Sequence, residues 1–216
     1  MPDMTDDLFA DDAAPLILGP ESLLLQGYAK GIDVALHDAI TRITSEAPWR
    51  QMVTPGGFTM SVGLTSCGAL GWISDVTGYR YSPTDPLSGR PWPAMPEVLL
   101  SLARSAAAQA GFPAFEPDAC LINRYLPGSK MSLHQDKDER DLQHPIVSVS
   151  LGIAATFLFG GLRRRDPTIR VPLTHGDVVV WGGVDRLRFH GVTPVKDGTH
   201  PLIGSQRINL TFRKAG

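Results

Sequence analysis

The sequence predicts a mainly β protein with flanking helices, and the pattern of its second half is the main reason. After residue 117, eight short segments of strand-like composition follow one another, separated by turn signals such as Pro127-Gly128 and Asp197-Gly198. So many strands in so few residues are typical of a barrel or a double-sheet jelly roll. The expected strands are 119–125, 131–136, 146–152, 155–159, 169–173, 178–181, 189–193 and 206–213.

Length and composition agree with one globular unit. The chain has 216 residues, of which 43% are hydrophobic and 19% are charged, and single cores commonly reach about 150–250 residues. These values exclude a fibrous, coiled-coil or wholly disordered chain. No apolar run approaches the roughly 20 residues that span a bilayer, and no secretion signal is recognisable. We therefore expect a soluble, cytoplasmic monomer.

The first half of the chain is predicted to contain a tail, two helices and a flap. Residues 1–14 include five aspartates and no basic residue, which predicts a flexible acidic tail. Helical spacing of apolar residues predicts a helix in at least the second half of 20–47, ended by Pro48, and another over 96–110, ended by Gly111. Residues 51–95 are rich in Gly, Pro and aromatics, as in a binding flap of short strands and loops. In this organisation 15–117 packs on a core formed by 118–216.

The cysteine content and the net charge limit the kinds of site and partner that the sequence allows. Cys67 and Cys120 are too few for a disulfide framework and lie in no metal-binding spacing, so reduced thiols are expected. The net charge of −2 argues against a generic polyanion binder. However, residues 160–216 hold 10 Lys and Arg against 4 Asp and Glu, so this end of the chain can still face phosphate.

His134 and Asp136 are the first candidates for a metal site. They lie two residues apart, so on a strand their side chains project from the same face. A carboxylate and two imidazoles form the facial triad that holds ferrous iron with open positions, and His190 on a late strand is the best third ligand. Taken alone, the pair fits a surface strand beside the charged segment 137–140 equally well.

A second His-x-Asp pair, His175 and Asp177, has a simpler interpretation. Gly176 lies between them, and the apolar run 178–181 follows directly. A Gly-Asp turn that leads into a buried strand explains this pattern, so we expect no metal there.

The last predicted strand presents two faces of different character. Alternation places Arg207, Asn209, Thr211 and Arg213 on one face and three apolar residues on the other. Two arginines on the concave side of a strand indicate a bound anion, and side chains that lean inward can grip both ends of a dicarboxylate. A solvated polar face is the alternative interpretation.

Together these residues resemble the AlkB family of nucleic-acid demethylases among the Fe(II)/2-oxoglutarate dioxygenases. The resemblance covers nearly the whole chain, including 50–61, 91–96 and 118–138, and its most specific motif is Arg-x-Asn-x-Thr-x-Arg at 207–213. It implies a double-stranded β-helix, or jelly-roll, core with an N-terminal helix and a substrate-binding flap. It also implies Fe(II), 2-oxoglutarate and O2 as cofactor and cosubstrates.

The resemblance implies a role for each matching position. The implied iron ligands and catalytic residues are His134, Asp136 and His190. The implied 2-oxoglutarate site comprises Asn123, Arg124, Tyr125, Arg207, Asn209, Thr211 and Arg213, with Arg207 on the distal carboxylate and Arg213 nearer the 1-carboxylate. The implied substrate-binding residues are Trp72, Tyr79, Arg80, Tyr81, Asp138 and Arg164.

The implied activity is demethylation of N-alkylated bases such as 1-methyladenine and 3-methylcytosine. Alkylated single-stranded DNA is the expected partner, with duplex DNA and RNA as further substrates. The products are formaldehyde, succinate and CO2. Two alternatives remain at this point: a 2-oxoglutarate oxygenase acting on a protein or small molecule, and a non-catalytic jelly-roll binding protein. The triad and the arginine-lined strand argue against the latter, and the aromatic flap argues against the former.

Overall fold

A computed structural model of the chain describes residues 14–216. The aspartates on which the predicted acidic tail rests lie outside the described residues. Among residues 14–216, no helix is long and apolar enough to cross a membrane.

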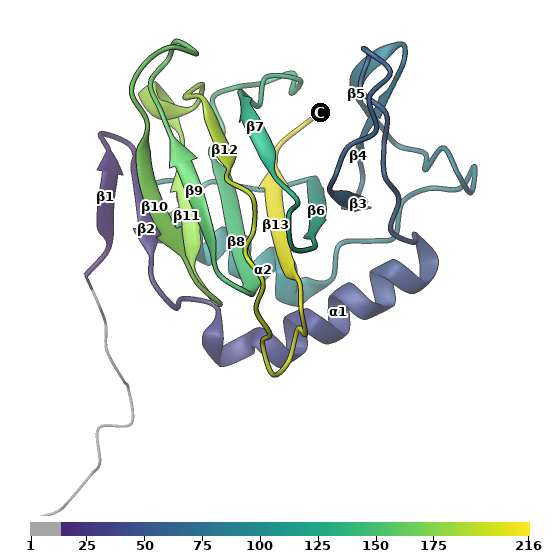
Figure 1. Cartoon of the computed structure of the whole chain (residues 1–216), viewed down its shortest axis with the longest axis horizontal. Helices are drawn as coiled ribbons and strands as arrows, with labels where there is room; N and C mark the ends of the chain where they lie inside the picture. Colours follow the sequence, from purple (N-terminus) through teal and green to yellow (C-terminus); the bar gives the residue numbers. More distant parts are fainter. Residues whose placement is uncertain (1–13) are drawn as a thin grey trace, which may run out of the picture.

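Two antiparallel sheets form the core (Figure 1). In spatial order, the seven-stranded sheet consists of β1 (Leu16–Gly19), β2 (Ser22–Leu25), β11 (Val178–Trp181), β8 (Ile146–Gly152), β13 (Arg207–Arg213), β6 (Ala119–Tyr125) and β3 (Gly63–Gly68). The four-stranded sheet consists of β10 (Ile169–Leu173), β9 (Ala155–Phe159), β12 (His190–Val192) and β7 (Met131–His134). This arrangement confirms the predicted mainly β jelly-roll core, and all eight strands predicted after residue 117 are present.

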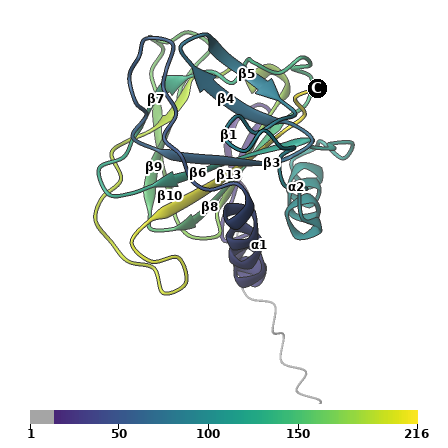
Figure 2. The ribbon, with the colours of Figure 1, turned by 90° about the vertical axis from the view of Figure 1, so that its right-hand side faces the viewer.

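Two helices cover the outer face of the seven-stranded sheet. They are α1 (Asp33–Glu46) and α2 (Glu97–Gln109), and short 3-10 turns occur at η1 (Lys30–Ile32) and η2 (Gly183–Asp185). The buried side of α1 includes Leu36 and Ile40, and that of α2 includes Leu99 and Leu102; these residues share one apolar cluster with β8, β11 and β13. Figure 2 shows both helices on the side of the molecule opposite β7 and β9. The inner face of the large sheet is therefore left to face the small one.

A second apolar cluster fills the space between the sheets. Its aromatic members are Tyr125, Phe157, Phe159 and Trp181. The rings of Phe157 and Trp181 lie 5.9 and 4.9 Å from the ring of His190, so this cluster also supports a candidate site residue.

The hairpin of β4 (Gly71–Asp75) and β5 (Gly78–Ser82) forms a separate two-stranded sheet. Figure 1 shows it beside the open end of the two large sheets. It lies within the segment predicted to be the flap.

The helix predicted for at least the second half of 20–47 is confirmed as α1, and the apolar residues before it belong to strands. Residues 20–25 lie in or next to β1 and β2 and not in a helix, and α1 begins only at Asp33. Leu25 packs toward the helices and Leu24 toward the space between the sheets. Because β2 is covered on both faces, its apolar residues are consecutive and show neither a helical nor an alternating period.

The predicted flap segment also supplies a core strand. β3 pairs along its whole length with β6, and five of its six residues are buried. Gly63, Thr65 and Ser66 of this strand are small and buried, and in the sequence such residues are typical of a loop.

Candidate active site

A cleft of about 830 Å³ opens between the two sheets and the β4–β5 hairpin. Strands β6, β7, β12 and β13 provide its floor and walls, and the hairpin contributes Trp72, Tyr79 and Tyr81 at its rim. Every predicted iron ligand lines it.

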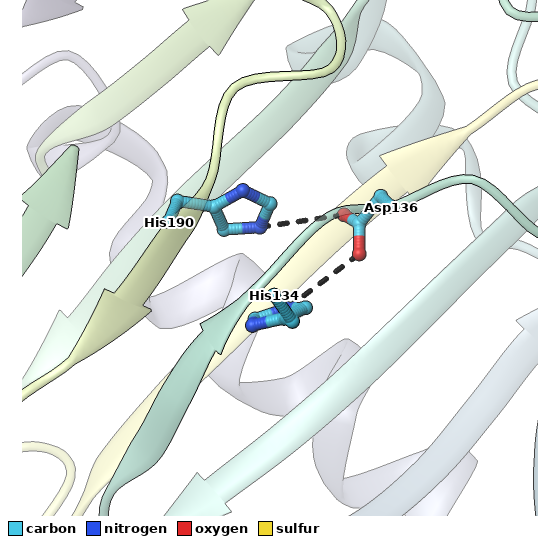
Figure 3. Close-up of side chains that lie close together, drawn as sticks. All are labelled: His134, Asp136 and His190. Atoms are coloured by element: carbon cyan, nitrogen blue, oxygen red, sulfur yellow. Dashed lines mark ion pairs between the residues drawn. The ribbon is translucent and has the colours of Figure 1, made fainter. Parts of the chain in front are cut away.

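The structure brings the three predicted iron ligands together (Figure 3). His134 Nε2 lies 3.6 Å from Asp136 Oδ1, and His190 Nε2 lies 3.7 Å from Asp136 Oδ2. One potential ligand atom from each residue falls within 4.8 Å of the others. Strand β7 stops at His134, so Asp136 lies just beyond it. The side chains of the two residues still point toward the same place, as their two-residue spacing predicts.

Backbone carbonyls orient both imidazoles toward this point. His134 Nδ1 lies 2.8 Å from the carbonyl of Ser132, and His190 Nδ1 lies 3.0 Å from that of Arg188. When Nδ1–H donates to a carbonyl, the Nε2 lone pair is left free for a metal. Both Nε2 atoms face Asp136, as this requires.

The charges around Asp136 favour the protonation states that a metal needs. Burial alone would raise the pKa of Asp136, but the nearby charges of Arg213, His190 and His134 hold it well below its usual range. Burial, together with the charge of His134, lowers the pKa of His190 to about 4. At neutral pH this predicts an ionised carboxylate and a neutral imidazole, both ready to bind a divalent cation. The donor set therefore fits Fe(II).

Arg207 is a buried cation in need of an anion. The residue is 1% exposed, its Nη2 donates to Ser150 Oγ at 2.9 Å, and its guanidinium lies over the Tyr125 ring. Its Nε and Nη1 have no hydrogen-bond partner within residues 14–216. A buried charge left in this state is costly, and a carboxylate is the ligand whose geometry a guanidinium matches best. The unpartnered nitrogens therefore fit the distal end of 2-oxoglutarate.

The alternation predicted for the last strand is confirmed. Arg207, Asn209, Thr211 and Arg213 line the cleft, whereas the apolar residues of β13 belong to the cluster under the helices. Asn209 donates to Ser148 Oγ and to the Val149 carbonyl, and Thr211 donates to Asn209 Oδ1. The polar residues thus fix one another's orientation.

Arg213 occupies a position different from that of Arg207. Its Nη2 donates to Asp136 Oδ2 at 2.5 Å, and its Nε lies 3.2 Å from Glu139 Oε1. It contacts the metal site directly, which agrees with the expectation that it lies at the end nearer the 1-carboxylate.

Arg124 does not join the other predicted 2-oxoglutarate residues. Its neighbours Asn123 and Tyr125 line the cleft, but alternation along β6 directs Arg124 to the opposite face. There its guanidinium lies over the Trp49 ring and borders a separate cavity of about 320 Å³.

Most of the predicted substrate residues surround the mouth of the cleft. The rings of Trp72 and Tyr79 stack with their centroids 5.4 Å apart, and Trp72 Nε1 donates to Asp138 Oδ2 at 2.9 Å. Tyr81 and Arg164 also line the cleft. Arg80 does not, because it lies on the other face of β5 and pairs with Asp75 in an exposed ion pair.

The second His-x-Asp pair is a structural turn, as predicted. Asp177 accepts hydrogen bonds from the N–H groups of Gly27 and Thr174. His175 faces Asp33 at 3.1 Å and stacks on His200.

Two further cleft residues were not found from the sequence. Glu139 is buried beside Arg213, and Phe58 lies at the rim with 76% of its surface exposed. Glu139 belongs to a run of charges that usually marks a solvated turn, and Phe58 belongs to the Gly-rich part of the flap, so neither stood out.

Comparisons with known proteins agree with this geometry. The family described as the 2OG-Fe(II) oxygenase superfamily matches residues 21–213. The protein named "Alpha-ketoglutarate-dependent dioxygenase AlkB" of Salmonella typhimurium is 57% identical over 97% of this chain and 97% of its own length. The protein of the same name in Escherichia coli is 56% identical, over 97% and 98% respectively.

Two other matches are more distant. A protein of Arabidopsis thaliana named "DNA N(6)-methyladenine demethylase ALKBH1C" is 34% identical over 68% of this chain and 38% of its own length. The solved structure titled "The structure of OsALKBH1" superposes with a TM-score of 0.80 at 30% identity, covering 93% of this chain and 100% of that one.

Proposed function

The chain belongs to the 2OG-Fe(II) oxygenase superfamily and, within it, to the AlkB dioxygenases, and on this premise we propose that it removes alkyl groups from nucleic-acid bases. It is an Fe(II)/2-oxoglutarate-dependent dioxygenase. The proposed substrates are 1-methyladenine and 3-methylcytosine in single-stranded DNA, with RNA and duplex DNA as further substrates.

The observation that supports this most directly is the combination of an oriented triad and an unpaired arginine in one cleft. We assign iron to His134, Asp136 and His190, and the distal carboxylate of 2-oxoglutarate to Arg207. When bound, iron with 2-oxoglutarate and O2 supplies oxidation of the N-methyl group, which yields succinate, CO2 and finally formaldehyde. The chain needs no general base for this reaction, and we assign none.

The aromatic rim suits an extruded base. Trp72 is held by Tyr79 on one ring face and by Asp138 at its indole nitrogen. A base that stacks on such a fixed ring gains about 1–3 kcal/mol. Asp138 lies next to this ring, where its carboxylate favours a methylated base that carries positive charge.

Two basic residues at the cleft suit the phosphates of the strand. Lys130 is exposed, and Arg164 lies over the Phe189 ring and donates to the Leu133 carbonyl. Both line the same cleft as Trp72. Phosphate contacts position a strand without reading its sequence, as a repair enzyme requires.

A single strand is the preferred form of the substrate on energetic grounds. Removing a base from a duplex costs a few kcal/mol, and less when the base is unpaired or when methylation blocks its pairing edge. We further propose that the chain acts as a cytoplasmic monomer with one catalytic unit, in which residues 118–216 supply most of the dioxygenase core and residues 15–117 supply the helices, the flap and the three strands β1 to β3 of the large sheet.

The test is succinate formation by the full chain with Fe(II), with and without a single-stranded oligonucleotide that carries one 1-methyladenine. The expected result is succinate that rises with the methylated oligonucleotide, with formaldehyde released in equal amount, and no rise with the unmethylated control. Succinate formation that the methylated oligonucleotide does not change would contradict a nucleic-acid substrate.

A further inference from the structure

Glu139 is a buried carboxylate that connects three elements around the cleft. Its side chain is 1% exposed. Oε1 accepts a hydrogen bond from Tyr81 Oη at 2.8 Å and lies 3.2 Å from Arg213 Nε, and Oε2 lies 3.1 Å from Arg186 Nη2. It therefore contacts two arginines and the flap at the same time.

Both arginines that contact Glu139 also contact Asp136. Arg213 donates from Nη2 and Nε to Asp136 Oδ2, at 2.5 and 3.1 Å. Arg186 donates from Nη1 to the backbone carbonyl of Asp136 at 2.7 Å, and from Nε to the carbonyl of His144 at 2.9 Å. One arginine fixes the carboxylate of Asp136 and the other fixes its backbone.

We propose that Glu139 is a positioning residue, which holds Asp136 in its metal-binding geometry through Arg213 and Arg186 and links that geometry to the flap through Tyr81. The two arginines and two carboxylates form a buried group whose charges balance. Loss of the Glu139 charge leaves one arginine without a counter-ion, and Arg213 then has Asp136 as its only close carboxylate among the described residues. A carboxylate bound more tightly by an arginine is a weaker metal ligand.

The link to the flap follows from strand register. Tyr81 pairs directly with Trp72 across the β4–β5 hairpin. A hydrogen bond from Tyr81 to Glu139 therefore connects the strand that carries the stacking residue to the group that holds Asp136. The conformation of the hairpin and the geometry of the metal site are therefore coupled through the Glu139 carboxylate.

Cobalt(II) titration of the metal-free full chain tests the proposal without any nucleic acid. Glu139→Gln keeps the side-chain shape and removes the charge, and we expect it to weaken Co(II) binding by about 10–100-fold, the usual effect of losing an outer partner of a metal ligand. Arg186→Lys keeps the positive charge but cannot contact both Glu139 and the Asp136 carbonyl, and we expect a loss in the same direction.

Asp85→Asn is the matched control. Asp85 is 2% exposed and pairs with Arg50, away from the metal site. Removing the Asp85 charge is therefore expected to change the stability of the fold but not the affinity for Co(II). Tyr81→Phe removes only the flap contact. It is expected to weaken Co(II) binding, but by less than Glu139→Gln does, and to accelerate amide exchange over 78–82; unchanged Co(II) affinity would contradict the link to the flap.

The inference rests on the metal site of the proposed function, and the two can fail separately. A parent chain that does not bind Co(II) would contradict the metal site itself. If the parent binds and Glu139→Gln binds equally well, Glu139 has no positioning role. The same conclusion follows if Asp85→Asn loses as much affinity as Glu139→Gln. If Glu139→Gln fails to fold, parental Co(II) affinity in Arg186→Lys would overturn the proposal.

Discussion

His190 lies directly opposite His134 across the antiparallel pair of β12 and β7. The register is irregular immediately afterwards, where Gly191 follows His190 and Val192 pairs with Met131. A Cβ atom at Gly191 would lie 2.7 Å from the Met131 carbonyl oxygen, closer than side chains tolerate. The absence of a side chain at Gly191 lets the two strands approach, and the centroids of the two imidazole rings lie 4.4 Å apart.

Gly191→Ala is therefore expected to weaken metal binding without abolishing the fold. The added methyl group must push β12 and β7 apart, and this moves His190 relative to His134. Co(II) affinity would be compared with thermal stability. A variant with parental affinity would show that the strands can adapt at this point. Gly198→Ala is the control, because a Cβ atom added there would lie 3.4 Å from Ile153 Cγ2, an ordinary contact distance.

Replacement of any one triad residue by alanine is expected to abolish turnover, whereas His175→Ala retains it. His134, Asp136 and His190 supply the ligand atoms, while His175 belongs to a turn that pairs with Asp33. Bound iron per chain and succinate yield are the measurements. An inactive His175→Ala variant beside an active His134→Ala variant would reverse the ligand assignment.

Arg207→Lys is expected to raise the KM for 2-oxoglutarate much more than the KM for the oligonucleotide. A lysine ammonium keeps the charge but cannot reproduce the two-pronged geometry with which a guanidinium binds a carboxylate. Steady-state kinetics with each substrate varied in turn will separate the two constants. Equal changes in both would exclude Arg207 as the cosubstrate residue.

Trp72→Ala is expected to cost about 1–3 kcal/mol of oligonucleotide binding, and Trp72→Phe less, if the ring stacks on the extruded base. Stacking releases no counterions, so the dependence of affinity on salt should not change. Arg164→Ala should instead make the log–log salt slope shallower by about 0.7, the value for one phosphate contact on a single strand. Titrations of a methylated oligonucleotide at several salt concentrations, without O2, give both quantities. Unchanged affinity in Trp72→Ala would identify Trp72 as a packing residue only.

Asp85→Asn is expected to destabilise the chain by up to about 3–5 kcal/mol at neutral pH, because Arg50, whose side chain is only 10% exposed, loses its charged partner. Burial alone would raise the pKa of Asp85, but hydrogen bonds from Arg50, Leu87 and Ser88 hold it below the ordinary value. A lowered pKa in the folded state means that this stability is present above about pH 4 and is lost as the pH falls further. Urea unfolding of both chains between pH 3 and pH 8 tests it. A difference between parent and variant that grows toward low pH would contradict the assignment.

Local patterns were sufficient for the core strands after residue 117, whereas the triad also needed the resemblance, because the His-x-Asp spacing alone fits a surface strand equally well and His190 lies far along the chain. Alternation separated the two faces of 207–213, and the His-x-Asp spacing survived the early end of β7. The same alternation also contradicts two of the implied roles. Arg80 lies between Tyr79 and Tyr81, and Arg124 between Asn123 and Tyr125, so each must face away from its neighbours, as the structure shows.

Other features depend on contacts that no local pattern records. Leu23–Leu25 form a strand because β11 lies beside them and both faces are covered. Glu139 is buried because Arg186, at the end of η2, and Arg213, on β13, come to it from distant parts of the chain, although its own neighbours in sequence are charged. The predicted boundary of the core lies between residues 117 and 118. The sequence could not show that β3, which precedes this boundary, pairs with β6 at the edge of the large sheet.

The isolation of the β4–β5 hairpin has a consequence for how such an enzyme can diversify. The hairpin forms a sheet of its own, and its turn at 75–78 lies far along the chain from every triad residue. Substitutions or insertions in that turn leave the ladders of both large sheets intact. Changes in the hairpin can therefore alter which damaged bases are accepted while the iron site stays the same. Such changes must preserve the contact between Tyr81 and Glu139.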